Sequence, residues 1–159
     1  MGYRKFNKDA YDAFDMSSKL QLVKIIEKNS PYKLNDDLDI ERYKDGDVEF
    51  IFNNKKVLFE NEVRRNFDDI VSIYKTIHIP IRKKDTPANF YIVWKEDLCQ
   101  FILIDRKTIQ KYKNKPIRVK CNNEMNYDEE YVEEFVDIPK SETQWYLVGK
   151  EFKLKKLEY

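Results

Sequence analysis

Three acidic residues, Asp47, Glu60 and Glu62, have the types and the spacing that could bind a metal ion. Asp47 opens a strand-like run that ends at Phe52, and the two glutamates lie in a second run, residues 56–64. If the two runs pair as a hairpin, the three carboxylates converge at one end of it. Converging carboxylates repel one another unless a hard cation neutralises them. The pattern therefore predicts a site for Mg²⁺ or Mn²⁺.

The second run, KVLFENEVR, divides into a charged face and an apolar face. Alternate side chains of a strand point to opposite sides, so residues two apart share a face. The charged face carries Glu60, Glu62 and Arg64, and the apolar face, which we expect in the core, carries Val57, Phe59 and Val63.

Metal-dependent hydrolysis of a phosphodiester is the chemistry that these residues suggest. Asp47 and Glu60 would bind one or two divalent ions, which polarise the scissile phosphate and lower the pKa of the attacking water. Glu62 would be a general base or a further ligand. A cation must also stabilise the charge of the transition state. The candidate phosphate contacts are Arg64, Arg65, Arg82, Lys83 and Lys84.

Length and composition limit the other possibilities. A chain of 159 residues predicts one domain, 1–159, and 14% aromatic residues argue against disorder despite 37% charged residues. The net charge of +1 means that a polyanion site must be a local patch. Three glycines are too few for a P-loop or a dinucleotide fingerprint. The chain shows no apolar signal region and no membrane-spanning run, which predicts a soluble, cytoplasmic protein.

Apolar spacing and turn residues predict the order of the elements. The turn at Asp45-Gly46 places Asp47 at the first residue of its strand. The expected elements are a helix at 9–29, strands near 40–43, at 47–52 and 56–64, a helix at 67–74, strands at 76–81, 90–94 and 101–104, a short helix at 105–113 and a strand at 117–120. This order predicts an α/β or α+β fold with a mixed sheet flanked by helices.

At the acidic residues the sequence resembles the PD-(D/E)xK nuclease superfamily. The motif of that family is an acidic residue that opens the second core strand, followed by (D/E)-x-K on the third. Gly46-Asp47 matches the first half and Glu60-Asn61-Glu62 the second, with Glu62 in place of the lysine. The resemblance implies a restriction-endonuclease-like core at 9–104, built from a helix, three antiparallel strands, a second helix and a further strand, with 105–159 as a C-terminal extension packing on it.

The resemblance also implies a function and its partners. It implies a Mg²⁺-dependent endonuclease that acts on nucleic acid, with DNA favoured over RNA. Some restriction enzymes of the superfamily carry E-x-E, so a glutamate at position 62 is compatible with catalytic activity. In several members a glutamate of the first helix joins the site, and Glu27 is the matching residue. A homodimer would suit cleavage of both strands, although the sequence does not show one.

Other interpretations remain open. The first is a catalytically inactive member of the same fold, which serves as a protein-binding or regulatory module; Glu62 and the near-neutral charge favour it. The second is an interaction protein with an unrelated α+β fold. The acids would then line the solvated face of a hairpin. The richness in Lys, Asn and Tyr fits an AT-rich genome, such as that of a phage or mobile element.

Overall fold

The computed structural model describes residues 8–29, 47–52, 54–123 and 126–159. The strand expected near 40–43 and the turn at Asp45-Gly46 lie outside these residues.

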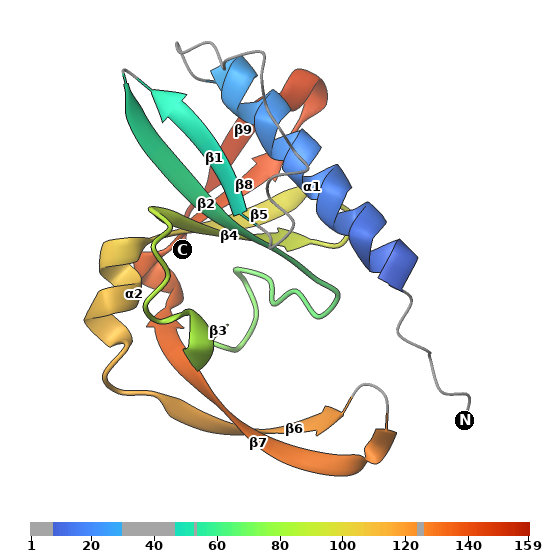
Figure 1. The fold of residues 1–159 in the computed structure, drawn as a ribbon, viewed down its shortest axis with the longest axis vertical. Helices are drawn as coiled ribbons and strands as arrows, with labels where there is room; N and C mark the ends of the chain where they lie inside the picture. Colours follow the sequence, from blue (N-terminus) through green and yellow to red (C-terminus); the bar gives the residue numbers. More distant parts are fainter. Residues whose placement is uncertain (1–7, 30–46, 53, 124–125) are drawn as a thin grey trace.

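The described residues form three layers, with a six-stranded mixed sheet in the middle (Figure 1). Its strands, in hydrogen-bonded order, are β1 (Asp47–Phe52), β2 (Lys55–Arg64), β4 (Phe90–Lys95), β5 (Gln100–Asp105), β8 (Gln144–Val148) and β9 (Leu154–Leu157). Neighbouring strands are antiparallel, except that β2 and β4 run parallel.

Different elements cover the two faces of this sheet. The helix α1 (Lys8–Asn29) packs on one face. The other face is covered by α2 (Arg106–Tyr112) and by a three-stranded antiparallel sheet, with strands in the order β3 (Thr76–Pro80), β7 (Asn126–Pro139) and β6 (Ile117–Asn123). Beyond their contact with β3, β6 and β7 continue as a curved two-stranded arm (Figure 1).

The hairpin of β1 and β2 forms as its sequence predicts. Phe52 pairs with Lys55, and Asn54 adopts a left-handed conformation with φ of 63°. Asparagine tolerates this conformation better than most residues, so it suits a tight hairpin turn. The resulting register places Asp47 opposite Glu60.

The apolar face of β2 lies in the core, as predicted, and there it packs against α1. Buried residues of the helix meet Phe59 and the same face of β4 and β5, and Val57 and Val63 lie at the edge of this cluster. Asn61 is the polar exception on that face. Its amide donates to Ser18 Oγ on α1 at 2.7 Å and accepts from Trp94 Nε1 at 2.9 Å. These bonds satisfy buried polar atoms where the helix meets the sheet.

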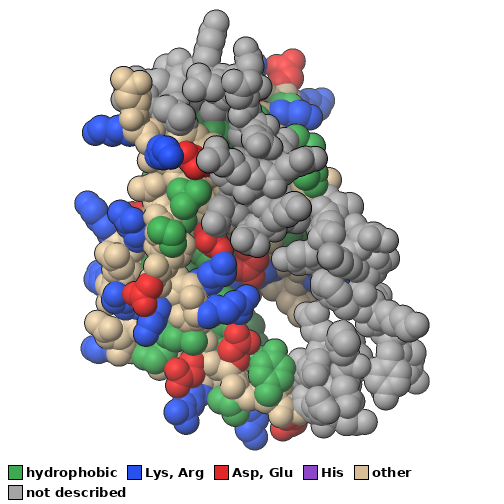
Figure 2. All heavy atoms as spheres, in the orientation of Figure 1, with side chains coloured by type: hydrophobic (Ala, Val, Ile, Leu, Met, Phe, Trp, Pro, Cys, Tyr) green, Lys and Arg blue, Asp and Glu red, His purple; other side chains and the backbone are tan. Residues whose placement is uncertain are grey.

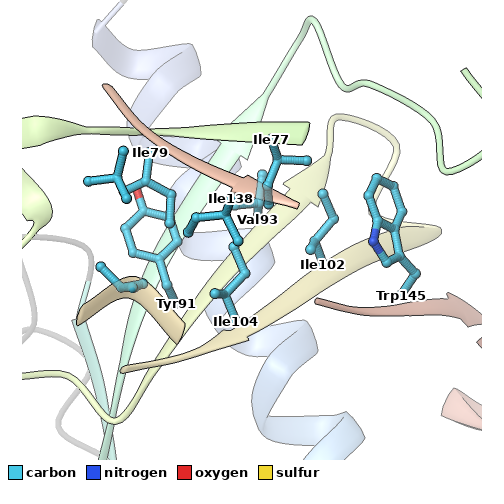
Figure 3. Packing of buried hydrophobic residues seen from close by; sticks show 10 residues of the cluster. Ile77, Ile79, Tyr91, Val93, Ile102, Ile104, Ile138 and Trp145 are labelled. Carbon is cyan, nitrogen blue, oxygen red and sulfur yellow. The ribbon is translucent and has the colours of Figure 1, made fainter. Parts of the chain in front are cut away.

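A second core fills the space between the two sheets. Isoleucines of β3 and β7 pack over Tyr91 and Val93 of β4 and over Ile102 and Ile104 of β5, and Trp145 closes one end (Figure 3). The charged residues of β2 therefore point toward this inner side of the six-stranded sheet, because Tyr91 and Val93 are the β4 partners of Glu60 and Glu62.

The prediction of a helix at 67–74 is wrong. These residues form bends and a turn. Phe67 and Ile70 pack against the core, but Val71, Ile73 and Tyr74 are 89%, 87% and 65% exposed. The apolar residues whose spacing suggested one buried helix face are thus divided, with some in the core and the others exposed to solvent.

The fold class is confirmed as mixed α+β, with two helices among the described residues. The expectation of a single sheet is corrected, because β3 joins β7 and β6 in a sheet of its own. Pro80 ends β3, which is an edge strand of this second sheet; proline suits this position because it has no N–H to donate to a further strand. No elements were predicted after residue 120, and the C-terminal residues form β7, β8 and β9.

Neither helix of the described part of the chain has the length and apolar character to cross a membrane.

Candidate nuclease site

The acidic residues lie on neighbouring strands and on the inner side of the central sheet. Glu60, Glu62 and Arg64 follow one another at every second position of β2. The backbone of Asp47 pairs with that of Glu60, so the register brings the two halves of the sequence motif together. The side chain of Asp47 is not among those that the structure describes.

Glu60 is a buried carboxylate with two partners from the crossover that follows β3. The residue is 6% exposed. Its Oε1 accepts from Lys83 Nζ, at the end of the 3-10 turn Ile81–Lys83, and its Oε2 accepts from Thr86 Oγ1 at 3.1 Å. A buried carboxylate is tolerated only when it is paired and hydrogen-bonded. Lys83 thus brings a cation to the acid that begins the E-x-E sequence.

Glu62 holds Arg64 in a two-point contact. Arg64 Nε donates to Glu62 Oε1 at 2.7 Å, and Nη2 donates to Oε2 at 3.2 Å. Tyr91 of β4 also donates its hydroxyl to Oε2. Arg64 Nη2 donates in addition to the carbonyl of His78 on β3 at 2.7 Å. The guanidinium is therefore fixed between the two sheets, because a planar fork held at two points has little freedom to rotate.

The electrostatic surroundings keep this pair ionised. Burial alone would raise the pKa of the Glu62 carboxyl, but the charge of Arg64 and the hydrogen bonds from Arg64 and Tyr91 outweigh it, so the pKa lies below its usual value. Burial likewise opposes the charge of Arg64, and Glu62 overrides it, which raises the pKa of the guanidinium. Burial and the neighbouring Glu62 both raise the pKa of Tyr91, which stays a neutral donor.

The lowered pKa of Glu62 predicts a contribution to acid sensitivity. A carboxyl whose pKa is lower in the folded state stabilises the fold at pH values above its unfolded pKa, about 4.3, and this stabilisation is lost as the pH falls through the folded value. Glu62→Gln should therefore unfold at lower urea concentration than wild type at pH 7, and the difference should shrink from pH 5 toward pH 3.

Urea unfolding at several pH values measures this effect. Glu49→Gln is a matched control, because it removes a glutamate of the neighbouring strand that pairs with exposed Lys56 and leaves Glu62 and Arg64 in place. A difference between Glu62→Gln and wild type that stays constant from pH 7 to pH 3 would contradict the assignment.

The other candidate residues are placed less centrally. Arg82 lies 3.7 Å from Glu133 of β7, and Arg65 lies 3.9 Å from Glu96; both cations are more than half exposed. Lys84 is exposed. Glu27 is exposed on α1, which packs on the opposite face of the sheet, so the structure does not bring it to Glu60 and Glu62.

Charges of both signs lie together on the face that Figure 2 shows, where Lys and Arg side chains are interspersed with Asp and Glu over the described part of the chain. This mixture agrees with the net charge of +1, and a polyanion on this part of the face would meet separate cations and not a broad basic field.

The two glutamates of the E-x-E sequence differ in how well they could bind a divalent cation. Both oxygens of Glu62 are engaged by Arg64 and Tyr91, which makes this residue a poor ligand. Each oxygen of Glu60 has one described partner, and a carboxylate oxygen accepts from two. Among side chains that the structure describes, no three metal-ligating groups come together. Glu60 is therefore the described carboxylate of the E-x-E sequence whose oxygens can still accept a further partner.

Comparison with known proteins identifies no relative. No family model, no curated protein and no solved structure matches the chain.

The sequence alone missed two residues of the site. Thr86 and Tyr91 contact the two glutamates, but nothing in their local sequence marks them. The alternation of β4 could have placed Tyr91 on the face of Glu60 once the pairing of β2 with β4 was known. That pairing joins residues about thirty positions apart, so periodicity does not reveal it.

Proposed function

We propose that this protein is a Mg²⁺-dependent phosphodiesterase, an endonuclease of the PD-(D/E)xK type that acts on DNA. The observation that carries the proposal is the register of the hairpin, which sets Asp47 opposite Glu60, where Lys83 supplies a cation. Acid, acid and lysine are the three residue types of the family motif. Here the lysine would come from the crossover and not from position 62.

The order of elements supports the proposal. A helix, α1, precedes the antiparallel pair of β1 and β2, and the chain then crosses to β4, which lies parallel to β2. This agrees with part of the family order, since the described residues contain the helix, two of the three antiparallel strands and the further strand. The crossover departs from that order, because residues 67–74 are not helical.

Each residue has a role that follows from its surroundings. Asp47 and Glu60 would hold the ion, which when bound polarises the phosphate and lowers the pKa of water. Lys83 would balance the charge of Glu60 and contact the phosphate or the attacking water. Arg64, four residues beyond Glu60 on β2, would contact a neighbouring phosphate of the nucleic-acid backbone. Glu62, with its lowered pKa and two donors, is a poor general base; we assign it to positioning Arg64.

The proposal is tested by cleavage and metal binding on the same protein. Wild type should cleave DNA with Mg²⁺ and not with EDTA, and calorimetry should detect binding of Mg²⁺. Asp47→Ala should abolish both signals while the protein stays folded by circular dichroism. Wild type that neither binds a divalent ion nor cleaves any DNA or RNA would overturn the proposal.

A second candidate is an inactive nuclease-like module that binds a partner without cleaving it. One observation favours it: both glutamates are neutralised within the protein, Glu60 by Lys83 and Glu62 by Arg64. Binding of DNA or of a protein partner that is unchanged by EDTA, with no cleavage, would support this candidate over the first.

A further inference from the structure

A cavity of about 440 Å³ lies beside Arg64, at the end of the charged face of β2. This volume is within the roughly 300–1,000 Å³ typical of small-molecule sites. Its apolar lining comes from Phe67, Tyr74, Ile77, Val93 and Ile102, and its polar lining from Arg64, Asn66, Asp68, Thr76 and His78. A mixed lining of this kind suits an aromatic ring that carries hydrogen-bonding edges.

The outer wall of the cavity is held in place by a buried lysine. Lys140 is fully buried, and its Nζ lies 2.8 Å from Asp68 Oδ2, 2.6 Å from the carbonyl of Asp69 and 2.8 Å from Ser72 Oγ. All three donors of the ammonium are thus used on one loop. A loop fixed in this way loses little entropy when a ligand binds, so the cavity is preformed.

Tyr74 lines the cavity and is also 65% exposed. An aromatic ring in this position offers one face to a ligand without any rearrangement of the core. Stacking of a nucleobase on an aromatic ring contributes affinity and tolerates any base, because every base has a π-face.

Arg64 connects the cavity to the carboxylates. Its hydrogen bonds to Glu62 and to the carbonyl of His78 use Nε and Nη2, and the guanidinium also lines the cavity. Four residues of strand separate Arg64 from Glu60, which is about 13 Å at about 3.3 Å per residue. A nucleic-acid strand covers this interval in a few nucleotides at about 3.4 Å per stacked base.

We propose that this cavity binds one unstacked base of the DNA strand, stacked on Tyr74, with the adjoining phosphate at Arg64. The inference rests on the proposed function and adds a substrate class: single-stranded DNA, or a duplex from which one nucleotide is displaced. Displacing a base from a duplex costs a few kcal/mol, and the cost is least where the base is already unpaired. The protein should therefore prefer unpaired over fully paired substrates.

Fluorescence of 2-aminopurine, a base analogue, tests the proposal without metal. Single-stranded oligonucleotides that carry this analogue at one position are titrated with wild-type protein in EDTA. We expect the fluorescence to change when the analogue occupies one particular position. Tyr74→Ala should bind the oligonucleotide at least about 10-fold more weakly than wild type, the loss expected when one stacking contact is removed. Tyr74→Trp should restore binding, because it restores a stacking surface.

Val71→Ala is the matched control, since Val71 is 89% exposed on the same loop but does not line the cavity. It should bind as wild type does. A second control removes the base and keeps the tyrosine: an oligonucleotide with an abasic position in place of the analogue is titrated with wild-type protein. Its affinity should fall to the level that Tyr74→Ala shows for the intact oligonucleotide.

Cleavage measured separately distinguishes the two proposals. If Mg²⁺-dependent cleavage occurs but Tyr74→Ala and the abasic position change neither binding nor cleavage, the cavity does not hold a base and the nuclease proposal stands. If base-dependent binding occurs without any cleavage, the nuclease proposal fails and the base site stands. Absence of binding to every oligonucleotide overturns the base site.

Discussion

Glu60→Gln is expected to lower Mg²⁺-dependent cleavage of DNA by about 100-fold or more, because loss of a direct metal ligand should exceed the 10- to 100-fold cost of losing an outer-shell partner. The amide keeps the shape of the side chain and can still accept from Thr86 Oγ1. It lacks the charge that a divalent ion requires. Steady-state cleavage at saturating Mg²⁺, with calorimetry for metal binding, measures the effect.

Glu49→Gln provides the comparison, because it removes the same charge from the adjacent strand of the hairpin, where the glutamate pairs with exposed Lys56. It should cleave as wild type does. If Glu60→Gln retains cleavage while folding normally, Glu60 is not a ligand and its contact with Lys83 serves stability alone.

Cleavage should also depend on Lys83. Lys83→Met should lower the cleavage rate with little change in Mg²⁺ affinity, since its ammonium would act on the phosphate or on the water. Lys84→Met, the next residue and an exposed one, should have no effect. Equal rates for the two variants would remove Lys83 from the site.

The second large effect concerns Lys140. Lys140→Met should reduce the free energy of unfolding by about 3 kcal/mol, the lower end of the usual cost of removing one partner of a buried ion pair, because Lys140 is fully buried but Asp68 is 32% exposed. Methionine fills the space, but Asp68 loses its cation, and the carbonyl of Asp69 and the hydroxyl of Ser72 lose their donor. At about 2–4 °C per kcal/mol for a chain of this size, the melting temperature should fall by roughly 10 °C.

Urea unfolding followed by tryptophan fluorescence measures this loss, because Lys140 Nζ lies 5.5 Å from the centre of the Trp145 ring. Lys113→Met serves as the control. Its pair with Asp85 spans 3.0 Å, but the aspartate is 64% exposed, and such surface pairs contribute about 0–1 kcal/mol. A loss below about 1 kcal/mol for Lys140→Met would mean that the loop is held by its apolar contacts.

The sequence predicted those parts of the site that depend on neighbouring residues. Alternation along β2 placed Glu60, Glu62 and Arg64 on one face, and the closeness of the two strand-like runs in the sequence suggested the hairpin that they form. Both patterns act over a few residues, where the geometry of a strand and the tolerance of Asn54 for positive φ decide the outcome.

The parts that were missed depend on partners distant in the chain. Helical spacing at 67–74 was overridden by Lys140, which lies about seventy residues later and fixes this segment as a loop. Lys83 was predicted to contact phosphate, yet nothing local indicates that it pairs with Glu60. Tertiary contacts of this kind outweigh local propensity, which differs by less than about 1 kcal/mol per residue among ordinary side chains.

The two sheets alternate along the chain. Strands β1 and β2 belong to the central sheet, β3 to the other, β4 and β5 to the first again, β6 and β7 to the second, and β8 and β9 to the first. Neither sheet can thus be assembled from one continuous stretch of sequence. A fragment that ends after β5 would leave β3 without its partner β7 and would expose the isoleucines of the inner core. The carboxylates on β2 are consequently shielded by residues from both halves of the chain, and the two sheets should unfold in one cooperative step.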